Sequence, residues 1–312
     1  MKSKIKKDPL VSIITPSFND AEFILDNIKS VKNQNWKNIE HIIFDGKSTD
    51  KTLSILKKSK DIIWFSEKDS GQSNAINKAL KLVKGEYIGW LNSDDSYNHH
   101  AIKRSINFLE NNKDIDLIYT DVNIINKNNK VFGVSKGREF SLENLLVNNP
   151  IKQPGVFFRR NILDEIEGLN ENLHYVMDRY FWLKIFYKNK SIKYIPYWIN
   201  ANFRLIEGTK SYDSIDKFKD EWISVLENSE ECKFYKKTKG NLINRAINKT
   251  KSSKYMYLMN KNLTKKNLFF ALVYFIKCIY HNIYILNNLG FYKLIYRSFV
   301  KGEYNPSQKY LK

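Results

Sequence analysis

The amino-acid sequence predicts an α/β protein, with a mainly parallel sheet flanked by helices and a helical C-terminal region after it. Two observations support this prediction. Short, almost continuously apolar runs alternate with segments of helical periodicity between residues 10 and 91. This alternation is typical of strands that crossover helices bury on both faces. After about residue 210 the strand-like runs stop and the pattern becomes helical.

Four strands and three helices are expected in the first 91 residues. The strands are short apolar runs, and the helices have apolar residues three or four positions apart. The expected strands are residues 10–15, 39–44, 61–66 and 86–91. The expected helices are residues 21–34, residues 48–59 with Ser48 or Thr49 as the N-cap, and residues 71–84, ending before Gly85.

The elements that follow are less regular. Strands are expected at residues 116–125, 130–134 and 154–160, a helix at 176–189, and a further strand at 192–200. Pro196 in the last strand indicates a position near a sheet edge, because proline cannot donate to the ladder. We expect residues 1–210 to form one domain, with halves at about 9–125 and 126–210, and residues 211–312 to form a helical region.

Charge is distributed unevenly along the chain. The net charge is +19, and residues 233–312 hold 17 Lys and Arg against one acid, Glu303. The first 232 residues have a balance of only +3. Such asymmetry indicates an anionic partner surface for the C-terminal part.

The cysteine content and the first residues indicate a compartment. Cys232 and Cys278 are too few for a disulfide framework and lack metal-binding spacing, which fits a reducing cytosol. The opening "MKSKIKKDPL" has no apolar segment of the secretory kind, so no such signal is expected.

Polar residues follow each of the first four expected strands, and the carboxyl ends of parallel strands meet at one rim. Pro16 is expected to end the first strand. The residues at this rim are Ser17, Asn19, Asp45, Gly46, Glu67, Asp69, Asp94 and Asp95. Ordinary turn and N-cap preferences for Asp, Asn and Ser are one explanation. For the adjacent Asp94 and Asp95 we favour a functional explanation, because like charges placed together stabilise nothing by themselves.

A nucleoside diphosphate cannot bind such carboxylates directly, since the charges repel. A divalent cation between them takes oxygen ligands from an aspartate and from the phosphates. It then stabilises the departing diphosphate as a Lewis acid. The rim therefore predicts a site for a divalent metal, Mn²⁺ or Mg²⁺, and a nucleotide.

Five segments in order resemble glycosyltransferase family 2, which has the GT-A fold. They are "VSIITPSFND", "FDGKSTDKT", "SEKDSGQSNAINKAL", "KGEYIGWLNSDD" and "YVMDRYFWLKI", within about residues 9–205. The resemblance implies metal-dependent, inverting transfer of a hexose or N-acetylhexosamine. The donor would be a nucleotide-sugar, usually of UDP, and the acceptor a saccharide or lipid-linked sugar in polysaccharide biosynthesis.

The resemblance also implies roles for particular residues. Asp45 matches the aspartate that reads the base, Asp94 lies near the ribose or sugar, and Asp95 binds the metal. Asn92 and Ser93 stand where many relatives have further aspartate, so either Asp94 or Asp95 could be the metal ligand. The donor-binding residues are Thr15, Pro16, Ser17, Asn19, Asp45, Glu67, Asp69, Gly71, Asn74 and Asp94.

Inverting transfer also needs a base that accepts the proton of the attacking acceptor hydroxyl. Asp178, at the start of the expected helix 176–189, matches the family's acidic residue. The alternative is an ordinary first-turn acid favoured by the helix dipole. Weaker candidates for the acceptor side are Gln153, His174, Arg179 and Trp182, with Trp182 equally expected in the core and His174 in a solvated loop.

The segment 265–301 is dense in aromatic and aliphatic residues punctuated by Lys and Arg. Its longest stretch without Asp, Glu, Lys or Arg, residues 278–292, is too short and polar to span a bilayer. We expect an amphipathic helix at an anionic membrane surface, hence a peripheral position on the cytoplasmic face. On this helix, Lys277, His281 and Asn288 share one face, and Lys293 and Arg297 extend its polar side. The alternative is that these helices pack on the catalytic domain.

Other function classes fit less well. A nucleotidyltransferase would need a glycine-rich, basic phosphate loop, which "TPSFND" lacks. A nucleic-acid-binding protein acting through its basic tail, or a membrane-binding protein with a non-catalytic GT-A domain, is the remaining alternative. The near-neutral first 232 residues and the absence of a recognised nucleic-acid motif argue against nucleic acid as the partner.

Overall fold

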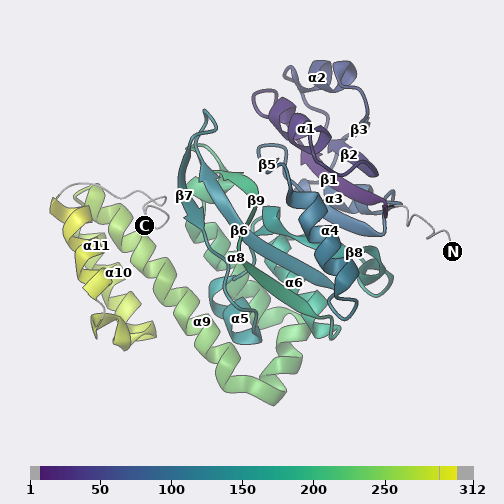
Figure 1. Ribbon diagram of the computed structural model, residues 1–312. Coiled ribbons are helices and arrows are strands. Elements are labelled where there is room, and N and C mark those ends of the chain that lie inside the picture. The colour runs from purple at the N-terminus through teal and green to yellow at the C-terminus, as the bar shows by residue number, and fades with distance from the viewer. Residues whose placement is uncertain (1–7, 288, 301–312) are drawn as a thin grey trace. The chain divides into compact units, whose positions relative to one another are not determined.

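The chain forms two compact units in the computed structural model, which describes residues 8–287 and 289–300 (Figure 1). The sheet unit consists of Met1–Ser141 and Asn149–Arg204. The helical unit consists of Leu142–Asn148 and Leu205–Lys312. Residues 142–148, which the sequence analysis placed in the second half of the catalytic domain, thus belong to the helical unit.

Four parallel strands form the first half of the sheet, in the order β3-β2-β1-β4. These strands are β1 (Val11–Ser17), β2 (Ile39–Asp45), β3 (Ile63–Ser66) and β4 (Tyr87–Trp90). The connecting helices are α1 (Ile24–Lys32), α2 (Thr52–Lys58) and α3 (Gln72–Leu80). The predicted α/β fold class is confirmed, and the carboxyl ends of these strands meet at one edge.

The second half of the sheet is mixed. The order continues from β4 through β8, β6 and β9 to β5, and β7 pairs with β6. Strand β9 runs parallel to β6, whereas β5, β7 and β8 pair antiparallel with their neighbours. The elements are β5 (Ser96–Tyr97), α4 (Ala101–Asn111), β6 (Leu117–Ile125), β7 (Val131–Ser135), η1 (Gln153–Gly155), β8 (Phe157–Arg159), η2 (Arg160–Asp164), α6 (Met177–Tyr187) and β9 (Ile192–Arg204).

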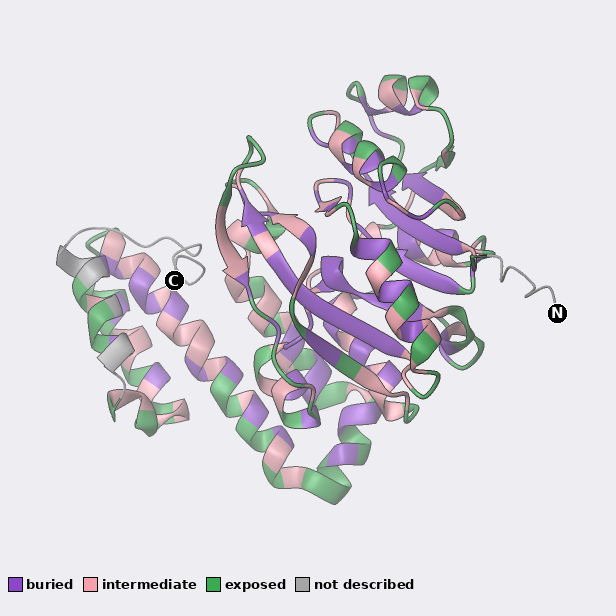
Figure 2. Ribbon diagram, in the orientation of Figure 1, coloured by how far each residue is buried: buried purple, intermediate pink, exposed green. Residues whose placement is uncertain are grey.

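The core of this unit lies along the central strands. Every residue of β1 and β4 is buried, whereas three of the four residues of the edge strand β3 are exposed. Figure 2 shows the same difference between the centre and the edge of the sheet. Continuous apolar sequence in β1 and β4 is what a strand covered on both faces requires.

Two helix boundaries differ from the sequence prediction. Helix α2 begins at Thr52, and neither Ser48 nor Thr49 is its N-cap. The hydroxyl of Ser48 donates to the carboxylate of Asp45 and accepts the backbone N–H of Asn19 at 2.7 Å instead of an N–H of the helix. Helix α3 ends at Leu80, four residues before the predicted end, and a turn completes the connection.

Both prolines discussed above lie within strands. Pro16 does not end β1, which continues to Ser17. Strand β4 pairs with β1 only as far as Ile14, so Pro16 has a neighbouring strand on one side alone and its missing N–H is tolerated. Pro196 follows Ile195, where the register of β9 against β6 shifts.

The helical unit is built around the long helix α9. Its elements are α5 (Leu142–Asn148), α7 (Lys210–Asp213), α8 (Ile215–Asn228), α9 (Glu230–Thr264), α10 (Leu268–His281), η3 (Ile283–Asn287) and α11 (Leu289–Val300). Helix α9 is kinked at Lys239, which has non-helical φ and ψ of −140° and 43°. The indole N–H of the buried Trp222 donates to the carbonyl of Leu146 at 3.0 Å and ties α5 to this unit.

The C-terminal segment is not the single amphipathic helix that the sequence predicted. Helix α10 ends at His281, and a 3-10 turn separates it from α11. Lys277 and Lys293 therefore belong to different helices. Asn288, the side chain of Arg297 and residues 301–312 lie outside the described residues. Within residues 8–287 and 289–300, no helix combines the length and the apolar content needed to cross a membrane.

Both cysteines lie in the helical unit. Cys232 of α9 and Cys278 of α10 are buried, free thiols. The sulfur of Cys278 is 3.3 Å from the hydroxyl of Ser252 on α9, so it lies in the contact between the two helices.

Candidate active site

Asp45, at the end of β2, is held in a network of hydrogen bonds. It is buried, with 1% of its surface exposed. One carboxylate oxygen accepts the backbone N–H of Ser48 at 2.9 Å and the hydroxyl of Ser66 at 2.7 Å. The other oxygen accepts the Ser48 hydroxyl. Residues from the ends of β2 and β3 thus fix the carboxylate predicted to read a base.

The loop after β3 folds back on the end of β2. A Cβ on Gly46 would lie 2.7 Å from Oδ2 of Asp69, so a larger residue at position 46 would displace the Asp69 side chain. Asp69 Oδ1 accepts the N–H of Gly71 at 2.9 Å, and Gly71 has a φ of 124° that favours glycine. His174 lies beside Gly71, since a Cβ there would be 3.7 Å from its Nδ1. The loop thus brings together four residues, which are Gly46, Asp69, Gly71 and His174.

The residues predicted at the end of β1 divide into two groups. Thr15 and Pro16 are buried within the sheet, and the Thr15 hydroxyl is 3.0 Å from Nε2 of the buried His41. Thr15 therefore presents no surface to a ligand in this structure. Asn19 is exposed, with a φ of 53°, and its side-chain oxygen accepts the N–H of Thr49 at 2.8 Å. Its observed role is to join two loops of the rim.

Two further donor-side candidates are bonded to other protein groups. Glu67 forms an ion pair with Lys78 at 2.8 Å. The amide of Asn74 donates to Glu171 at 2.8 Å. Both side chains are partly or fully exposed, so these bonds leave them accessible to solvent.

The turn after β4 holds the Asp94–Asp95 pair, in which Asp95 is buried and Asp94 is half-buried. Asp95 is only 1% exposed, and its Oδ1 accepts the backbone N–H of Arg204 at 2.9 Å. Its Oδ2 is buried and has no hydrogen-bond partner among the described residues. Burial, and then the charge of Asp94, raises the pKa of Asp95 well above its ordinary value. Burial and then Asp20 raise the pKa of Asp94 to about 6.

Asp20 is a site residue that the sequence analysis missed. Its carboxylate accepts the hydroxyl of Ser93 and repels that of Asp94, and burial raises its pKa. The available signal was its position, directly after Asn19 in the polar loop that follows β1. The group of Asp20, Asp94 and Asp95 thus comes from two strand ends, those of β1 and β4.

Arg204, the last residue of β9, is a second residue of this site that was not predicted from the sequence. Its guanidinium is buried, donates to the carbonyl of Asp94 at 2.8 Å and lies 4.3 Å from the centre of the Phe23 ring. It also donates to the carbonyl of Asn126 at 2.8 Å and to Oδ1 of Asn129 at 2.7 Å. Arg204 therefore fixes the Asp94–Asp95 turn against the hairpin between β6 and β7. No local sequence pattern marks it.

Asn92, which stands where relatives have aspartate, is the centre of an amide network. Its Oδ1 accepts Nε2 of Gln72 and Nε1 of Trp90, both at 2.9 Å, and its Nδ2 donates to Gln153 at 3.2 Å. The Gln153 amide in turn donates to the carbonyl of Trp90 at 2.7 Å. Gln153 is buried and braces the end of β4, although it was predicted on the acceptor side.

Helix α6 contributes the predicted base and its neighbours. Asp178 lies in the first turn and is half-buried, and burial raises its pKa while Arg179 opposes that rise. Arg179 is itself buried. Trp182 is 0% exposed, and its ring centre is 6.3 Å from that of Trp90. Of the two positions that the sequence left open for Trp182, the structure shows the core.

The donor set of the turn fits a cation. Among residues 8–287 and 289–300, no three His, Cys, Asp or Glu side chains come together as a complete metal site. The buried, unpartnered Oδ2 of Asp95 is nevertheless an oxygen ligand of the kind hard divalent cations prefer. The turn can thus supply part of a coordination sphere, to be completed by a ligand.

The fold and the rim define an α/β protein of the class that binds ligands outside the carboxyl ends of parallel strands. Residues 12–166 match the model of glycosyl transferase family 2, and the chain belongs to this family. It is 33% identical over 186 residues to an uncharacterised glycosyltransferase of Rickettsia typhi, covering 56% of this chain and 58% of the relative. It is 28% identical over 255 residues to chondroitin synthase of Escherichia coli, covering 74% and 36%. The chain spans less than two thirds of the length of these relatives.

Two solved structures share the fold at low identity. TarS 1–349 of S. aureus, in complex with UDP-GlcNAc, has a TM-score of 0.59 and 17% identity, covering 95% of this chain and 93% of that chain. The mannosyltransferase PcManGT of Pyrobaculum calidifontis, with GDP-Man and Mn²⁺, has a TM-score of 0.59 and 14% identity, covering 94% and 87%. The GT-A fold expected from the sequence is confirmed.

Proposed function

We propose that the protein is a metal-dependent, inverting glycosyltransferase that moves a sugar from a nucleotide-sugar to a saccharide or lipid-linked acceptor in polysaccharide biosynthesis. One observation supports this most directly. The end of β4 holds the half-buried Asp94 and the buried Asp95 beside Asp20, and Oδ2 of Asp95 has no hydrogen-bond partner in the described structure. A buried acceptor of this kind is costly unless a ligand uses it.

The donor would bind along the rim formed by β1, β2 and β3. Asp45 is held rigidly by Ser48 and Ser66, as a group that recognises a base should be. The loop at Gly71 lies beside His174 and would cover the sugar. The UDP-GlcNAc bound by the structural relative TarS supports a UDP-sugar as the donor, and the GDP-Man bound by PcManGT keeps the base open to test.

Asp95 and Asp94 would hold the divalent metal, Mn²⁺ or Mg²⁺. When bound, the metal supplies positive charge that offsets the developing charge of the diphosphate. Arg204 holds both aspartates in place through the carbonyl of Asp94 and the Oδ1 of Asp95. The role of this chain's residues is therefore to keep the metal-binding oxygens aligned in a buried turn.

Asp178 would act as the general base. It would take the proton of the acceptor hydroxyl as the hydroxyl oxygen attacks the anomeric carbon, and the bond from that carbon to the diphosphate would break. The raised pKa of Asp178 makes its carboxylate a stronger base than an exposed aspartate. The neighbouring Arg179 limits that rise.

Calorimetric titration tests the donor proposal. The full chain is titrated with UDP, GDP, CDP and TDP, with and without Mn²⁺. We expect one nucleotide to bind at least tenfold more tightly with Mn²⁺. If no nucleotide binds under either condition, the proposal of a nucleotide-sugar-dependent enzyme is wrong.

We propose that the helical unit associates with anionic membrane surfaces. The exposed residues Leu268, Leu272, Ile276 and Tyr280 form an apolar stripe at intervals of four along α10. The segment 233–312 adds 17 basic residues against one acid. An apolar face combined with excess Lys and Arg matches an interfacial helix.

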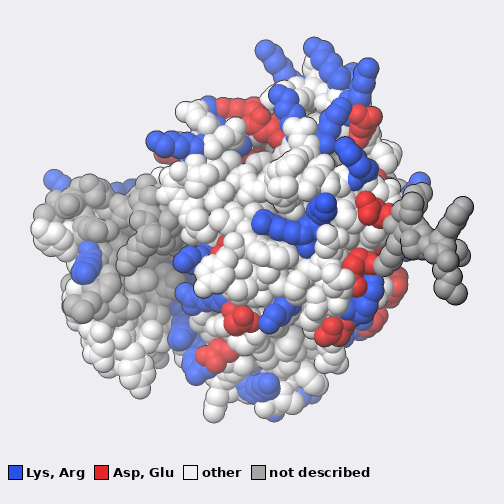
Figure 3. Space-filling view, viewed as in Figure 1, with Lys and Arg blue, Asp and Glu red and all other residues white. Residues whose placement is uncertain are grey.

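Vesicle flotation separates this proposal from nucleic-acid binding. We expect the protein to float with vesicles of phosphatidylserine and phosphatidylcholine but not with phosphatidylcholine alone. Leu272→Glu together with Ile276→Glu should abolish flotation. Salt-sensitive binding of a DNA oligonucleotide without flotation would favour nucleic acid instead. On the face in view in Figure 3, acidic and basic side chains are interspersed.

A further inference from the structure

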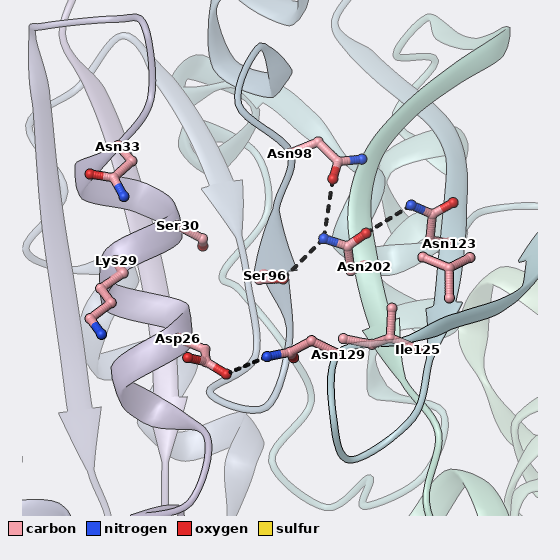
Figure 4. Close-up of a pocket in the computed structure, with 11 residues that line it drawn as sticks. Asp26, Lys29, Ser30, Asn33, Ser96, Asn98, Asn123, Ile125, Asn129 and Asn202 are labelled. Carbon is pink, nitrogen blue, oxygen red and sulfur yellow. Dashed lines mark hydrogen bonds between the residues drawn. The ribbon is translucent and has the colours of Figure 1, made fainter.

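A second polar hollow lies in the sheet unit, away from the rim of β1, β2 and β3. It has a volume of about 430 Å³ and is bounded by α1, β5, β6, β9 and the loop before β7. Figure 4 shows the side chains that these elements contribute to it. Five asparagines and two serines line it, together with one lysine, one aspartate and two aliphatic residues. None of the lining residues is aromatic.

The asparagines at the floor of this hollow are fixed by bonds to one another. The Asn202 amide donates to the Ser96 hydroxyl and to Oδ1 of Asn98, each at 3.1 Å. Its oxygen accepts the amide of Asn123 at 2.8 Å (Figure 4). The hollow is therefore pre-organised, since these side chains are ordered before any ligand arrives.

Several polar groups around the floor remain free to bind a ligand. Oδ1 of Asn123 and the side chain of Asn33 have no hydrogen-bond partner within the described part of the chain. Lys29, on the exposed side of α1, forms no ion pair there. Asp26 uses one carboxylate oxygen to accept the amide of Asn129 at 2.9 Å and leaves the other open.

The side chains that line the hollow fit a saccharide better than other ligands. Amides and hydroxyls present donors and acceptors side by side, and each sugar hydroxyl is also both donor and acceptor. A diphosphate would require more than the single cation Lys29. A ligand held by apolar contacts would require more apolar wall than Ile125 and Val131 provide.

The hollow adjoins the Asp94–Asp95 turn through two connections. Ser96, at its floor, is the next residue after Asp95. Asn129, at its edge, accepts a hydrogen bond from the Arg204 guanidinium, which also holds the carbonyl of Asp94. A chain of sugar residues bound here would therefore lie against the back of the proposed metal-binding turn.

We propose that this asparagine-lined hollow is a saccharide-binding site that retains a unit of the acceptor or product glycan away from the point of transfer. The identity of the glycan rests on the proposed function. The class of ligand rests only on the side chains of the hollow.

Side-chain amide signals in NMR spectra test this directly. The ¹⁵N-labelled full chain is titrated with maltohexaose, chitohexaose and a hyaluronan hexasaccharide, which are neutral, N-acetylated and uronic probes. We expect saturable shifts of the NH₂ signals of Asn98, Asn123 and Asn202 with at least one probe. No saturable shift of these signals with any of the three would overturn the proposal.

Substitutions of residues that line the hollow test whether the saccharide binds there. Lys29→Ala and Asn123→Ala should each weaken saccharide binding at least tenfold. Lys32→Ala is the matched control, because Lys32 is exposed on the same helix, pairs with Asp61 at 3.0 Å and does not line the hollow. Undiminished saccharide binding in both Lys29→Ala and Asn123→Ala would also overturn the proposal.

Nucleotide titration of the same samples keeps the two proposals distinguishable. We expect nucleotide affinity with Mn²⁺ to be unchanged in Lys29→Ala, Asn123→Ala and Lys32→Ala. Saccharide shifts in a protein that binds no nucleotide would leave the hollow standing and remove the proposed donor chemistry. Nucleotide binding without saccharide shifts would overturn the proposed saccharide site and leave the proposed donor chemistry standing.

Discussion

Arg204 donates its backbone N–H to Oδ1 of Asp95 at 2.9 Å, although the two residues are 109 positions apart. The same residue holds the carbonyl of Asp94 through its guanidinium. The end of β9 thus determines the position of both carboxylates that follow β4. The geometry of the Asp94–Asp95 turn therefore depends on a strand that is distant in sequence.

Arg204→Met should destabilise the protein by about 3 kcal/mol, because it leaves buried carbonyls without their charged donor. We expect a matching loss of metal-dependent nucleotide affinity. Urea unfolding and calorimetry measure the two effects. Arg245→Met is the control, since Arg245 is half-exposed in its ion pair with Glu143 and should cost less than about 1 kcal/mol. Equal stability of the two variants would contradict the role of Arg204.

Asp95→Asn should abolish the gain in nucleotide affinity caused by Mn²⁺ while leaving the protein at least as stable as the parent. The amide oxygen can still accept the N–H of Arg204, and the substitution removes a buried charge. Titration with and without Mn²⁺, together with thermal unfolding, checks both expectations. Asp61→Asn, at an exposed carboxylate, should change neither. An undiminished Mn²⁺ effect in Asp95→Asn would rule out Asp95 as a metal ligand.

Asp178→Asn should lower the rate of sugar transfer by about 10² to 10⁴, the usual contribution of a general base. Donor affinity should be retained, because the substitution keeps the size of the side chain. The exposed Asp164→Asn serves as the control and should transfer at the parental rate. Transfer by Asp178→Asn at the rate of the control would show that another group takes the proton.

The stability of the protein should fall as the pH falls below about 6.5, in part because of His41. Burial lowers the pKa of His41 to about 3, so it stays neutral in the folded protein while the unfolded chain takes up a proton. The expected loss from this residue is about 2 kcal/mol at pH 5. This loss should be absent in His41→Gln and retained in His99→Gln, at an exposed histidine.

Unfolding by urea at pH 7, 6 and 5 measures this effect. Carboxyl groups with raised pKa values, such as those of Asp94 and Asp178, act in the opposite direction in all three proteins. The difference between the variants therefore isolates His41. Parallel pH profiles for the parent and His41→Gln would contradict the prediction.

The first half of the sheet could be predicted from sequence because its strands require continuous apolar residues. The same property placed Asp45, Asp94 and Asp95 at one edge, since parallel strands share the direction of their carboxyl ends. Helix ends were predicted less well. The Ser48 hydroxyl, expected at an N-cap, instead donates to Asp45 and accepts the backbone N–H of Asn19, and the sequence does not reveal which nearby groups a hydroxyl will bond to.

Burial and long-range contacts could not be predicted. Thr15 belongs to the buried interior, although the motif series suggested contact with the donor. Trp182 lies in the core, which was one of the two positions that the sequence left open. Arg204 acts through a backbone N–H and a buried guanidinium, and neither leaves a pattern in the sequence. The single helix expected near the C-terminus is interrupted after His281, where Asn282 adopts an extended φ of −158°.

The two buried thiols provide a reporter of local opening. The protein has only two cysteines, Cys232 and Cys278, and both belong to the helical unit. A buried thiol reacts with an alkylating reagent only when its surroundings open. The rate of alkylation under native conditions would therefore measure the opening free energy of the helices alone. The sheet unit would contribute no alkylation signal, because it contains no cysteine. No cysteine would have to be added or removed for this measurement.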